Sequence, residues 1–389
     1  MATGNFTLPS AIVEEILLLL PYKCIHRFRS VSKSWSSLLV SEEFQKLRFK
    51  SSPPELNVQK ILHSFHGCYG EDYGMPLESF DYRGGEETCT QLFFPVERRF
   101  LKLIGSCNGL VCLTQESLVN NYRDIFLWNP FTGVYRKLPH TKGMSGRYGV
   151  YRAYGFGYDS VADDYKVFLA VVRRVSIRNK VRRLYPVVQI FSLKTGSWKS
   201  VKNPDRCLQD ILKRDSVGLF LNGALHWSKR DTAKITAFDL VKETFYDVPP
   251  PPEQEGLGYR GIGGMVGGYL CASWYLAPRS EPCVVWVMKE YMNKKSWVPF
   301  IESYWSYSNR THYAFVSYKC NFIPCHVKDG DLMMLEFCDE SQATEVLEWR
   351  KNTGKSDSVR VKYYHCYGSI PYTEALTSPY PASEVDQGF

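Results

Sequence analysis

The pattern of hydrophobic and polar positions changes once along the chain, near residue 50. Before that point, apolar residues recur at spacings of three and four, as they do on one face of a helix. After it, short apolar runs rich in aromatic and β-branched residues are separated by Gly, Pro, Asn and Asp, as strands are separated by turns. This change predicts a small all-α segment at residues 1–50, with two to three helices, followed by a large all-β domain.

The first helix is predicted in LPSAIVEEILLLLP, residues 8–21. Pro9 is accepted in the first turn of a helix, where no N–H is needed, and Pro21 ends the helix. A second amphipathic stretch, KCIHRFRSVSKSWSSLLVSEEF, follows at residues 23–44. About 45 residues of short helices cannot bury this much apolar surface by themselves. The surface is therefore covered either by the rest of the chain or by a partner protein.

The remaining chain repeats a strand–turn–strand pattern. The repeated segments are IFLWNPFTGVYRKL, VQIFSLKTGSWKSV, ITAFDLVKETFYDV, VWVMKEYMNKKSWVPF and, less completely, EVLEWRKNTGKSDSV. A second set of Gly-marked turns precedes most of them, in NGLVCL, NGALHW, GGYLCAS and DGDLMML. The spacing of roughly 50 to 60 residues is typical of a β-propeller, in which kelch repeats run ~50 residues. We predict a five- or six-bladed β-propeller over residues 96–375; a β-sandwich with coincidental hairpins is the alternative.

The segments around the repeats have weaker signals. Residues 51–95 are predicted to be a linker that also supplies edge or closing strands. Residues 376–389 are predicted to be a disordered tail. The glycine-rich stretch GIGGMVGG, residues 261–268, is predicted to be a turn between blades.

Composition and motifs exclude several classes of protein. No run reaches the ~18–20 apolar residues of a membrane span, and the opening leucines lack the basic segment and cleavage site of a signal peptide. The 12 cysteines are scattered, which favours reduced thiols and a cytoplasmic or nuclear protein. The chain has no GxSxG, GxxxxGK[ST] or HExxH motif, and Cys320, Cys325 and His326 lack a fourth zinc ligand at a matching spacing. We predict no catalytic residue, metal or cofactor, and therefore no enzyme.

One charged stretch is unusual in a chain of net charge +8: VVRRVSIRNKVRRLYPVV, residues 171–188. Its basic residues, with no acidic residue among them, are Arg173, Arg174, Arg178, Lys180, Arg182 and Arg183. It is interpreted as a solvated hairpin loop, as a basic patch for an acidic protein surface, or as a nucleic-acid site. The lack of interleaved aromatic residues and of a known binding motif disfavours nucleic acid.

Residues 6–48 resemble the F-box motif: an LP pair at 8–9, an aliphatic helix, a second LP pair at 20–21, and RFRSVSKSW ending at Trp35. Two serines stand where cysteine is common in that family, and they are expected to be tolerated. The resemblance implies docking on a Skp-family adaptor, which binds a cullin. The matching apolar positions, some facing the adaptor and some holding the helices together, are Leu8, Pro9, Ile12, Ile16, Leu17, Leu20, Pro21, Val31 and Trp35.

The repeats resemble the plant F-box-associated domain, through GSCNGLVCL, LWNPFTGVYRKLP, YGFGYDSVADDYKV, FDLVKETF and VWVMKEY. VWVMKEY and the closing ALTSP are also similar to the S-locus F-box group, which acts in pollen recognition of pistil ribonucleases. The resemblance implies a substrate-recognition subunit of an SCF-type ubiquitin ligase, with a pistil S-ribonuclease as the sharpest candidate target. The alternatives are an F-box protein that sequesters a partner without ubiquitination, and a propeller that binds protein or RNA through residues 171–188.

Overall fold

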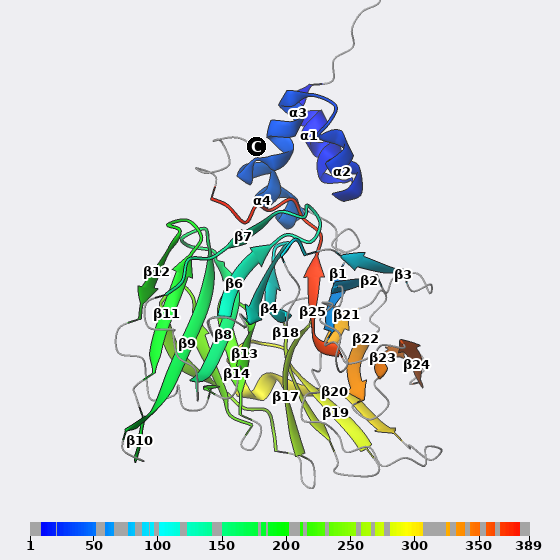
Figure 1. Ribbon diagram of the computed structural model, residues 1–389. Coiled ribbons are helices and arrows are strands. Elements are labelled where there is room, and N and C mark those ends of the chain that lie inside the picture. Colours follow the sequence, from blue (N-terminus) through cyan, green and yellow to red (C-terminus); the bar gives the residue numbers. More distant parts are fainter. Residues whose placement is uncertain are drawn as a thin grey trace, which may run out of the picture.

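A computed structural model of the chain has a helical N-terminal part and a larger all-β domain (Figure 1). The structure describes residues 9–20, 22–51, 59–65, 77–81, 88–92, 94–96, 101–116, 123–141, 150–177, 180–183, 186–201, 211–212, 216–229, 233–253, 258–265, 269–275, 281–305, 324–326, 332–338, 343–350, 355–361 and 366–381. The predicted fold class, a small helical F-box followed by a β-propeller, is confirmed.

The helical part contains α1 (Ser10–Leu18), α2 (Tyr22–Phe28), α3 (Lys33–Val40) and α4 (Glu42–Ser51). Serine hydroxyls begin the last two helices. Ser32 Oγ accepts a hydrogen bond from the Trp35 N–H at 3.1 Å, and Ser41 Oγ accepts one from the Phe44 N–H at 3.2 Å. Ser32 is therefore tolerated because it caps α3. Four helices are present instead of the predicted two to three, because Ser41 caps a separate helix, α4, directly after α3.

The β domain is built from four-stranded antiparallel units. The first unit contains β4 (Leu101–Cys107), β5 (Leu110–Glu116), β6 (Arg123–Trp128) and β7 (Tyr135–Lys137). The second contains β8 (Val150–Asp159), β9 (Asp164–Ile177), β11 (Val187–Ser192) and β12 (Ser197–Ser200); β10 (Lys180–Arg183) pairs with the end of β9. The third contains β13 (Ser216–Leu221), β14 (Ala224–Ser228), β15 (Ile235–Asp239) and β16 (Thr244–Val248), and the parallel pair β13–β8 joins it to the second.

The remaining units complete the series. The fourth contains β17 (Gly258–Met265), β18 (Tyr269–Tyr275), β19 (Glu281–Met288) and β20 (Trp297–Trp305), with a 3-10 turn η1 (Lys294–Ser296) before β20. The fifth contains β21 (Pro324–His326), β22 (Leu332–Cys338), β23 (Ala343–Arg350) and β24 (Lys355–Val361). The closing unit joins β25 (Cys366–Thr373) to β1 (Gln59–Phe65), β2 (Leu77–Asp81) and β3 (Thr88–Leu92). The described strands thus form six such units.

The repeat pattern of the sequence corresponds to these units. Each repeated segment forms the outer hairpin of one unit: β6–β7, β11–β12, β15–β16, β19–β20 and β23–β24. The Gly-marked turns connect the inner strands β4–β5 and β13–β14. The glycine-rich stretch at residues 261–268 was expected to be a turn between blades, and this is wrong. Most of it lies in β17, because pairing with β18 supplies the hydrogen bonds of an extended backbone.

The closing unit brings distant segments together. β1 pairs antiparallel with β25, with His63 opposite Ser369, so strands from both sides of the repeats share one sheet. The His63 Nδ1 lies 2.7 Å from Ser369 Oγ, and Lys60 forms an ion pair with Glu374. Pairing of this kind removes two free sheet edges. Strands β1, β2 and β3 are therefore part of the β domain.

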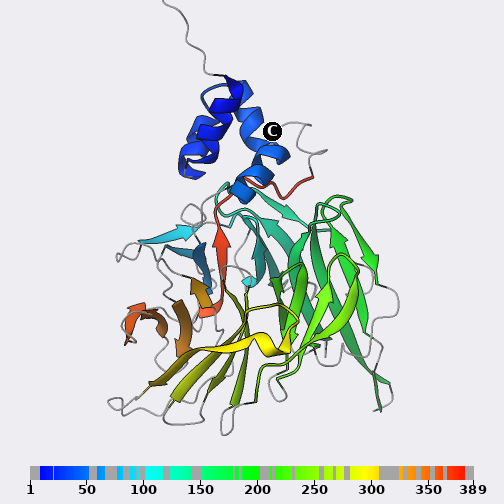
Figure 2. The same cartoon turned by 180° about the vertical axis from the view of Figure 1, so that it is seen from behind.

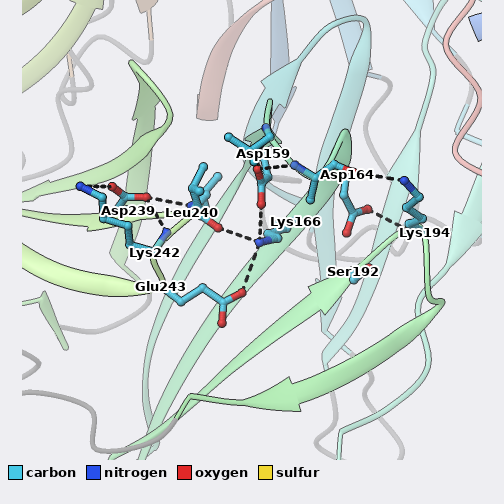
Figure 3. Close-up of polar contacts among 12 residues, drawn as sticks. Asp159, Asp164, Lys166, Ser192, Lys194, Asp239, Leu240, Lys242 and Glu243 are labelled. Carbon is cyan, nitrogen blue, oxygen red and sulfur yellow. Dashed lines mark hydrogen bonds and ion pairs between the residues drawn. The ribbon is translucent and has the colours of Figure 1, made fainter.

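The core lies between neighbouring units. At the junction of the second and third units, the ring centroid of Phe168 is 5.0 Å from those of Trp227 and Phe238. A buried polar contact accompanies this packing (Figure 3). Lys166 Nζ donates to Asp159 Oδ2 and to the Leu240 carbonyl, both at 2.7 Å. Because Leu240 belongs to the third unit, the contact joins the two units.

The two ends of the β domain differ. Because successive strands reverse direction, the inner hairpin turns and the outer hairpin turns lie at one end, which we call the turn face. The F-box helices lie at this end (Figure 1). The β9–β10 hairpin projects at the opposite end, and the same separation is visible from behind (Figure 2).

The prediction that a disordered tail begins at residue 376 is wrong, because residues 376–381 are packed against the β domain. Leu376 is only 6% exposed, Thr377 Oγ1 donates to the Asn108 carbonyl at 2.7 Å, and the Tyr380 hydroxyl donates to the Tyr135 carbonyl at 3.0 Å. These partners are far away in the sequence, so no local pattern marks the segment as ordered. Residues 382–389 lie outside the described part of the chain.

Candidate functional site

The inner face of the F-box is a compact apolar cluster. Leu17 is 1% exposed and Ile25 is fully buried, and Leu20 and Trp35 pack against the same cluster from partly exposed positions. The rings of Trp35 and Phe28 meet edge to face with centroids 5.6 Å apart. Of the predicted adaptor-binding residues, Leu17, Leu20 and Trp35 thus hold the helices together.

Arg48 of α4 ties the end of α1 into this cluster. Its guanidinium donates to the carbonyls of Leu17 at 2.9 Å and Leu18 at 3.0 Å, and also to that of Leu20. Carbonyls at a helix end are short of backbone donors, although that of Leu17 also accepts the Leu20 N–H at 3.3 Å. A cation suits the negative end of the helix dipole. The guanidinium also lies 4.1 Å from the ring centre of Tyr22. Burial raises the pKa of the Tyr22 hydroxyl, and the charge of Arg48 opposes this shift.

The outer face of α1 carries an exposed apolar stripe. Ile12, Ile16 and Leu19 are 44%, 46% and 62% exposed, and their spacing places them on one side of the helix. We call these three residues the α1 stripe. Val31, in the turn between α2 and α3, is also 60% exposed. Solvent exposure of this much aliphatic surface on a small helical domain marks a surface for a partner.

The predicted residue set and the exposed surface overlap only in part. Pro9, Ile12, Ile16 and Val31 are exposed, whereas Leu8 and Pro21 lie outside the described residues. Leu19 was missed. It lies three residues after Ile16, a spacing that could have identified it, but the unbroken aliphatic run gives no polar position to mark the outer face.

The basic stretch forms the β9–β10 hairpin at the end of the β domain opposite the F-box (Figure 1). The register places Arg183 opposite Arg174, and Arg182 opposite Val175. Arg173 lies on β9 and Lys180 begins β10, whereas Arg178 lies outside the described residues. Like charges directly opposite in a ladder are destabilising. The hairpin thus gathers positive charge at one projecting point.

Two titratable groups of the β domain, His226 and Cys107, lie in its packed interior. His226 is 1% exposed, and its Nε2 lies 2.6 Å from the Tyr291 hydroxyl. Burial lowers the pKa of His226 to about 4 and raises that of Cys107 to about 12. Within the described ranges, no three His, Cys, Asp or Glu side chains are arranged to hold a metal ion. The described helices include none that is long and apolar enough to cross a membrane.

Comparisons with known proteins agree with this division of the chain. Residues 6–47 match the F-box domain, and residues 90–371 match the F-box associated beta propeller domain. An F-box/kelch-repeat protein of Arabidopsis thaliana is 26% identical over 348 residues, which cover 85% of each chain. The F-box protein CPR1 of Arabidopsis thaliana is 29% identical over 75% of this chain and 71% of that protein. A further Arabidopsis thaliana F-box protein is 30% identical over 76% of this chain and 72% of its own length.

Proposed function

Because the chain belongs to the F-box proteins that carry an F-box associated beta propeller domain, we propose that it is the substrate-recognition subunit of an SCF-type ubiquitin ligase. The F-box binds a Skp-family adaptor and, through it, a cullin. The β domain binds the protein to be ubiquitinated. The subunit itself performs no chemistry; it raises the effective concentration of the target near the ubiquitin-loaded enzyme.

The α1 stripe is the observation that supports adaptor binding most directly. Ile12, Ile16 and Leu19 point away from the F-box cluster, and no described part of the β domain covers them. Burial of each large aliphatic side chain contributes roughly 1.5–3 kcal/mol. A few such residues at the centre of a contact dominate its binding energy.

The test is binding of the purified protein to a Skp-family adaptor, alone and with a cullin, by wild type and by the double variant Ile16→Asp/Leu19→Asp. Both residues are exposed, so the fold tolerates the change, but the carboxylates would be desolvated in the contact. We expect the affinity to fall at least about a hundredfold. Leu17 is unsuitable for this test because its substitution would unfold the F-box itself.

A matched control is Val161→Asp/Val241→Asp. Both valines are exposed, at 78% and 40%, in hairpin turns of the β domain. This variant carries the same added charge and is expected to bind the adaptor like wild type. Failure of the wild-type protein to bind any Skp-family adaptor would sink the proposal.

For the target we propose an acidic protein surface that the β9–β10 hairpin contacts. The hairpin lies at the end of the β domain opposite the F-box, where a target does not compete with the adaptor for space. The register of the β9–β10 ladder pairs Arg183 with Arg174, and a carboxylate-rich partner surface complements such a run of basic residues. A variant with Arg174→Ser and Arg183→Ser is expected to lose target binding but retain adaptor binding.

A pistil S-ribonuclease is the candidate target that the likeness to the S-locus F-box group supports, and pollen is the tissue that this likeness implies. The test is direct binding of the wild-type protein to pistil ribonucleases, beside the double serine variant. Binding of no ribonuclease would remove this target and leave the ligase subunit intact.

We also propose that the protein acts in the cytoplasm, with the nucleus as a second location. Among the described cysteines, the free thiols of Cys24, Cys107 and Cys112 support a reducing compartment. A fluorescent fusion in plant cells tests the location.

Sequestration without ubiquitination is the competing function. The two are separated by whether the target is degraded when the cullin is active and accumulates when the α1 stripe is replaced.

A further inference from the structure

The F-box cluster does not end at the F-box. Residues from the β domain complete it: Ala375 is fully buried in it, Leu376 is 6% exposed, and Phe131 packs against its edge. The Phe131 ring meets those of His26 and Tyr22 edge to face, with centroids 5.5 Å and 6.3 Å apart. Two segments of the β domain, far apart in sequence, therefore contact the helices that carry the adaptor surface.

The C-terminal segment Glu374–Pro381 is held onto the turn face by the first unit. The Asn129 side-chain amide, fully buried, donates to the carbonyls of Ala375 and Thr377, each at 2.8 Å. The Tyr380 ring lies 5.3 Å from the Arg136 guanidinium. The segment continues directly from β25, joins the F-box cluster at once through Ala375 and Leu376, and is tied at its far end to the first unit through Tyr380.

The repeats allow these contacts to be compared with equivalent positions in other units. The first and third outer hairpins superpose without gaps, so Asn129 corresponds to Asp239 and Phe131 to Val241. Asn129 and Asp239 each accept two turn N–H groups through Oδ1. The Asn129 amide also has N–H donors, which the Asp239 carboxylate lacks, and these donate to the C-terminal segment. Val241 is 40% exposed, whereas Phe131 lies against the F-box.

The inner turns show the same difference. Asn108–Gly109 and Asn222–Gly223 have nearly the same backbone, with φ of 49° and 84° in the first and 48° and 75° in the second. A Cβ on Gly109 would lie 2.4 Å from the Ala375 Cβ, whereas a Cβ on Gly223 would meet nothing within 4 Å. The first turn thus requires glycine for two reasons, its positive φ and the approach of the C-terminal segment.

We infer that the turn face of the first unit and residues 374–381 form a seat that completes the F-box and holds its adaptor-binding helices in place. Asn129, Gly109 and Phe131 are positioning residues: they touch no adaptor and act through the helices. The inference rests on the proposed adaptor binding. It also makes the F-box and the target-binding domain one rigid unit, which fixes the distance between the target and the ligase.

The first test compares Gly109→Ala with Gly223→Ala in the full chain. Both place a Cβ at a positive φ in the same kind of turn, so both cost similar backbone strain; only Gly109→Ala displaces Ala375. We expect Gly109→Ala to weaken adaptor binding by about tenfold or more, as loss of a buried contact would, and Gly223→Ala to leave it unchanged. Hydrogen exchange of the α1–α3 amides is expected to quicken only in Gly109→Ala.

The second test covers the case in which Gly109→Ala does not fold. Asn129→Asp keeps the Oδ1 acceptor of the turn but removes both donors to the C-terminal segment, and Asp239→Asn is the reverse change in the third unit. We expect quicker exchange in α1–α3 and weaker adaptor binding for Asn129→Asp alone.

The outcomes separate the two ideas. If the two variants of each matched pair show equal hydrogen exchange in α1–α3 and equal adaptor affinity, the inference that the seat positions the F-box is wrong. Faster exchange in the seat variants supports it even where the wild-type chain binds no adaptor, a result that would reject the proposed function alone.

Discussion

At the residue scale, one Asp or Asn side chain at the start of each of three hairpin turns sets the turn, and its chemistry then decides what else it does. Asp159, Asn129 and Asp239 each accept two backbone N–H groups through Oδ1. This local rule is readable in sequence because Asx turns use short-range contacts. The second oxygen or nitrogen differs among the three: Asp239 Oδ2 meets Lys242 of its own turn and Asp159 Oδ2 meets Lys166 of the next strand. Asn129 Nδ2 donates to the distant carbonyls of Ala375 and Thr377, which the local sequence does not show.

Lys166 links the Asp159 turn to the distant residues Leu240 and Glu243. Its Nζ lies 2.7 Å from Asp159 Oδ2 and 3.2 Å from Glu243 Oε1, and the Asp159 side chain is only 3% exposed. Replacement Lys166→Met leaves that carboxylate buried without its cation. We expect the free energy of unfolding to fall by about 3–5 kcal/mol, measured by chemical denaturation. Lys242→Met is the control, because the Lys242 side chain is 77% exposed, and a loss as large there would contradict the explanation.

The buried histidines predict a loss of stability in mild acid. Burial lowers the pKa of His226 from 6.5 to about 4 and that of His63 from 6.5 to about 3. The unfolded chain therefore takes up these protons at a higher pH than the folded chain. The stability that each neutral ring contributes is complete above about pH 6.5 and decreases as the pH falls toward the folded pKa.

Between pH 7 and pH 5 this amounts to about 2 kcal/mol for each histidine. Thermal unfolding over this range is the measurement. His226→Gln is expected to show a shallower dependence than wild type, since only the His63 contribution remains. An identical dependence in both proteins would mean that His226 is protonated in the folded state.

At the scale of elements, the inner strands pack through glycines where neighbouring units meet. A Cβ on Gly157 of β8 would lie 2.2 Å from the Phe220 ring of β13, whereas one on Gly105 of β4 would make ordinary contacts at 3.8 Å. Both residues lie in inner strands. The missing side chain on β8 is therefore what admits an aromatic ring from the next unit.

Gly157→Ala is expected to overpack this junction and to lower the free energy of unfolding by about 1–3 kcal/mol. Gly105→Ala in the equivalent strand is the comparison and is expected to change it by less than about 0.5 kcal/mol. Denaturant midpoints of the two variants measure the difference. Equal midpoints would show that the Phe220 ring moves aside without cost.

At the scale of the whole molecule, the closing unit makes the β domain depend on a segment that precedes its repeats. β25 pairs with β1 over residues 59–65, and β2 and β3 follow in the same sheet. A chain that begins at residue 53 keeps all three strands. A chain that begins at residue 96 loses them and leaves β25 as an open edge.

We expect the chain from residue 53 to be monomeric and the chain from residue 96 to aggregate, because an unpaired strand edge recruits other chains. Size-exclusion chromatography of the two proteins measures this. A monomeric, cooperatively folding chain from residue 96 would show that the closing pair is dispensable.

The sequence by itself determined the elements: the F-box helices, the repeated hairpins and their Gly-marked turns. These depend on periodicity, capping and turn chemistry, which act over a few residues. It also indicated the adaptor surface, but not which face of the run Ile16–Leu20 is outward, because five consecutive aliphatic residues contain no polar marker.

Only the tertiary structure decided which residues meet. It buried Leu17 and exposed Leu19, placed the basic hairpin opposite the F-box, and ordered the segment after β25 against Asn108, Asn129 and Phe131. These pairings join positions separated by as many as 269 residues. Their energy comes from packing and hydrogen bonds across the fold, and such contacts leave no periodic signal in a single sequence.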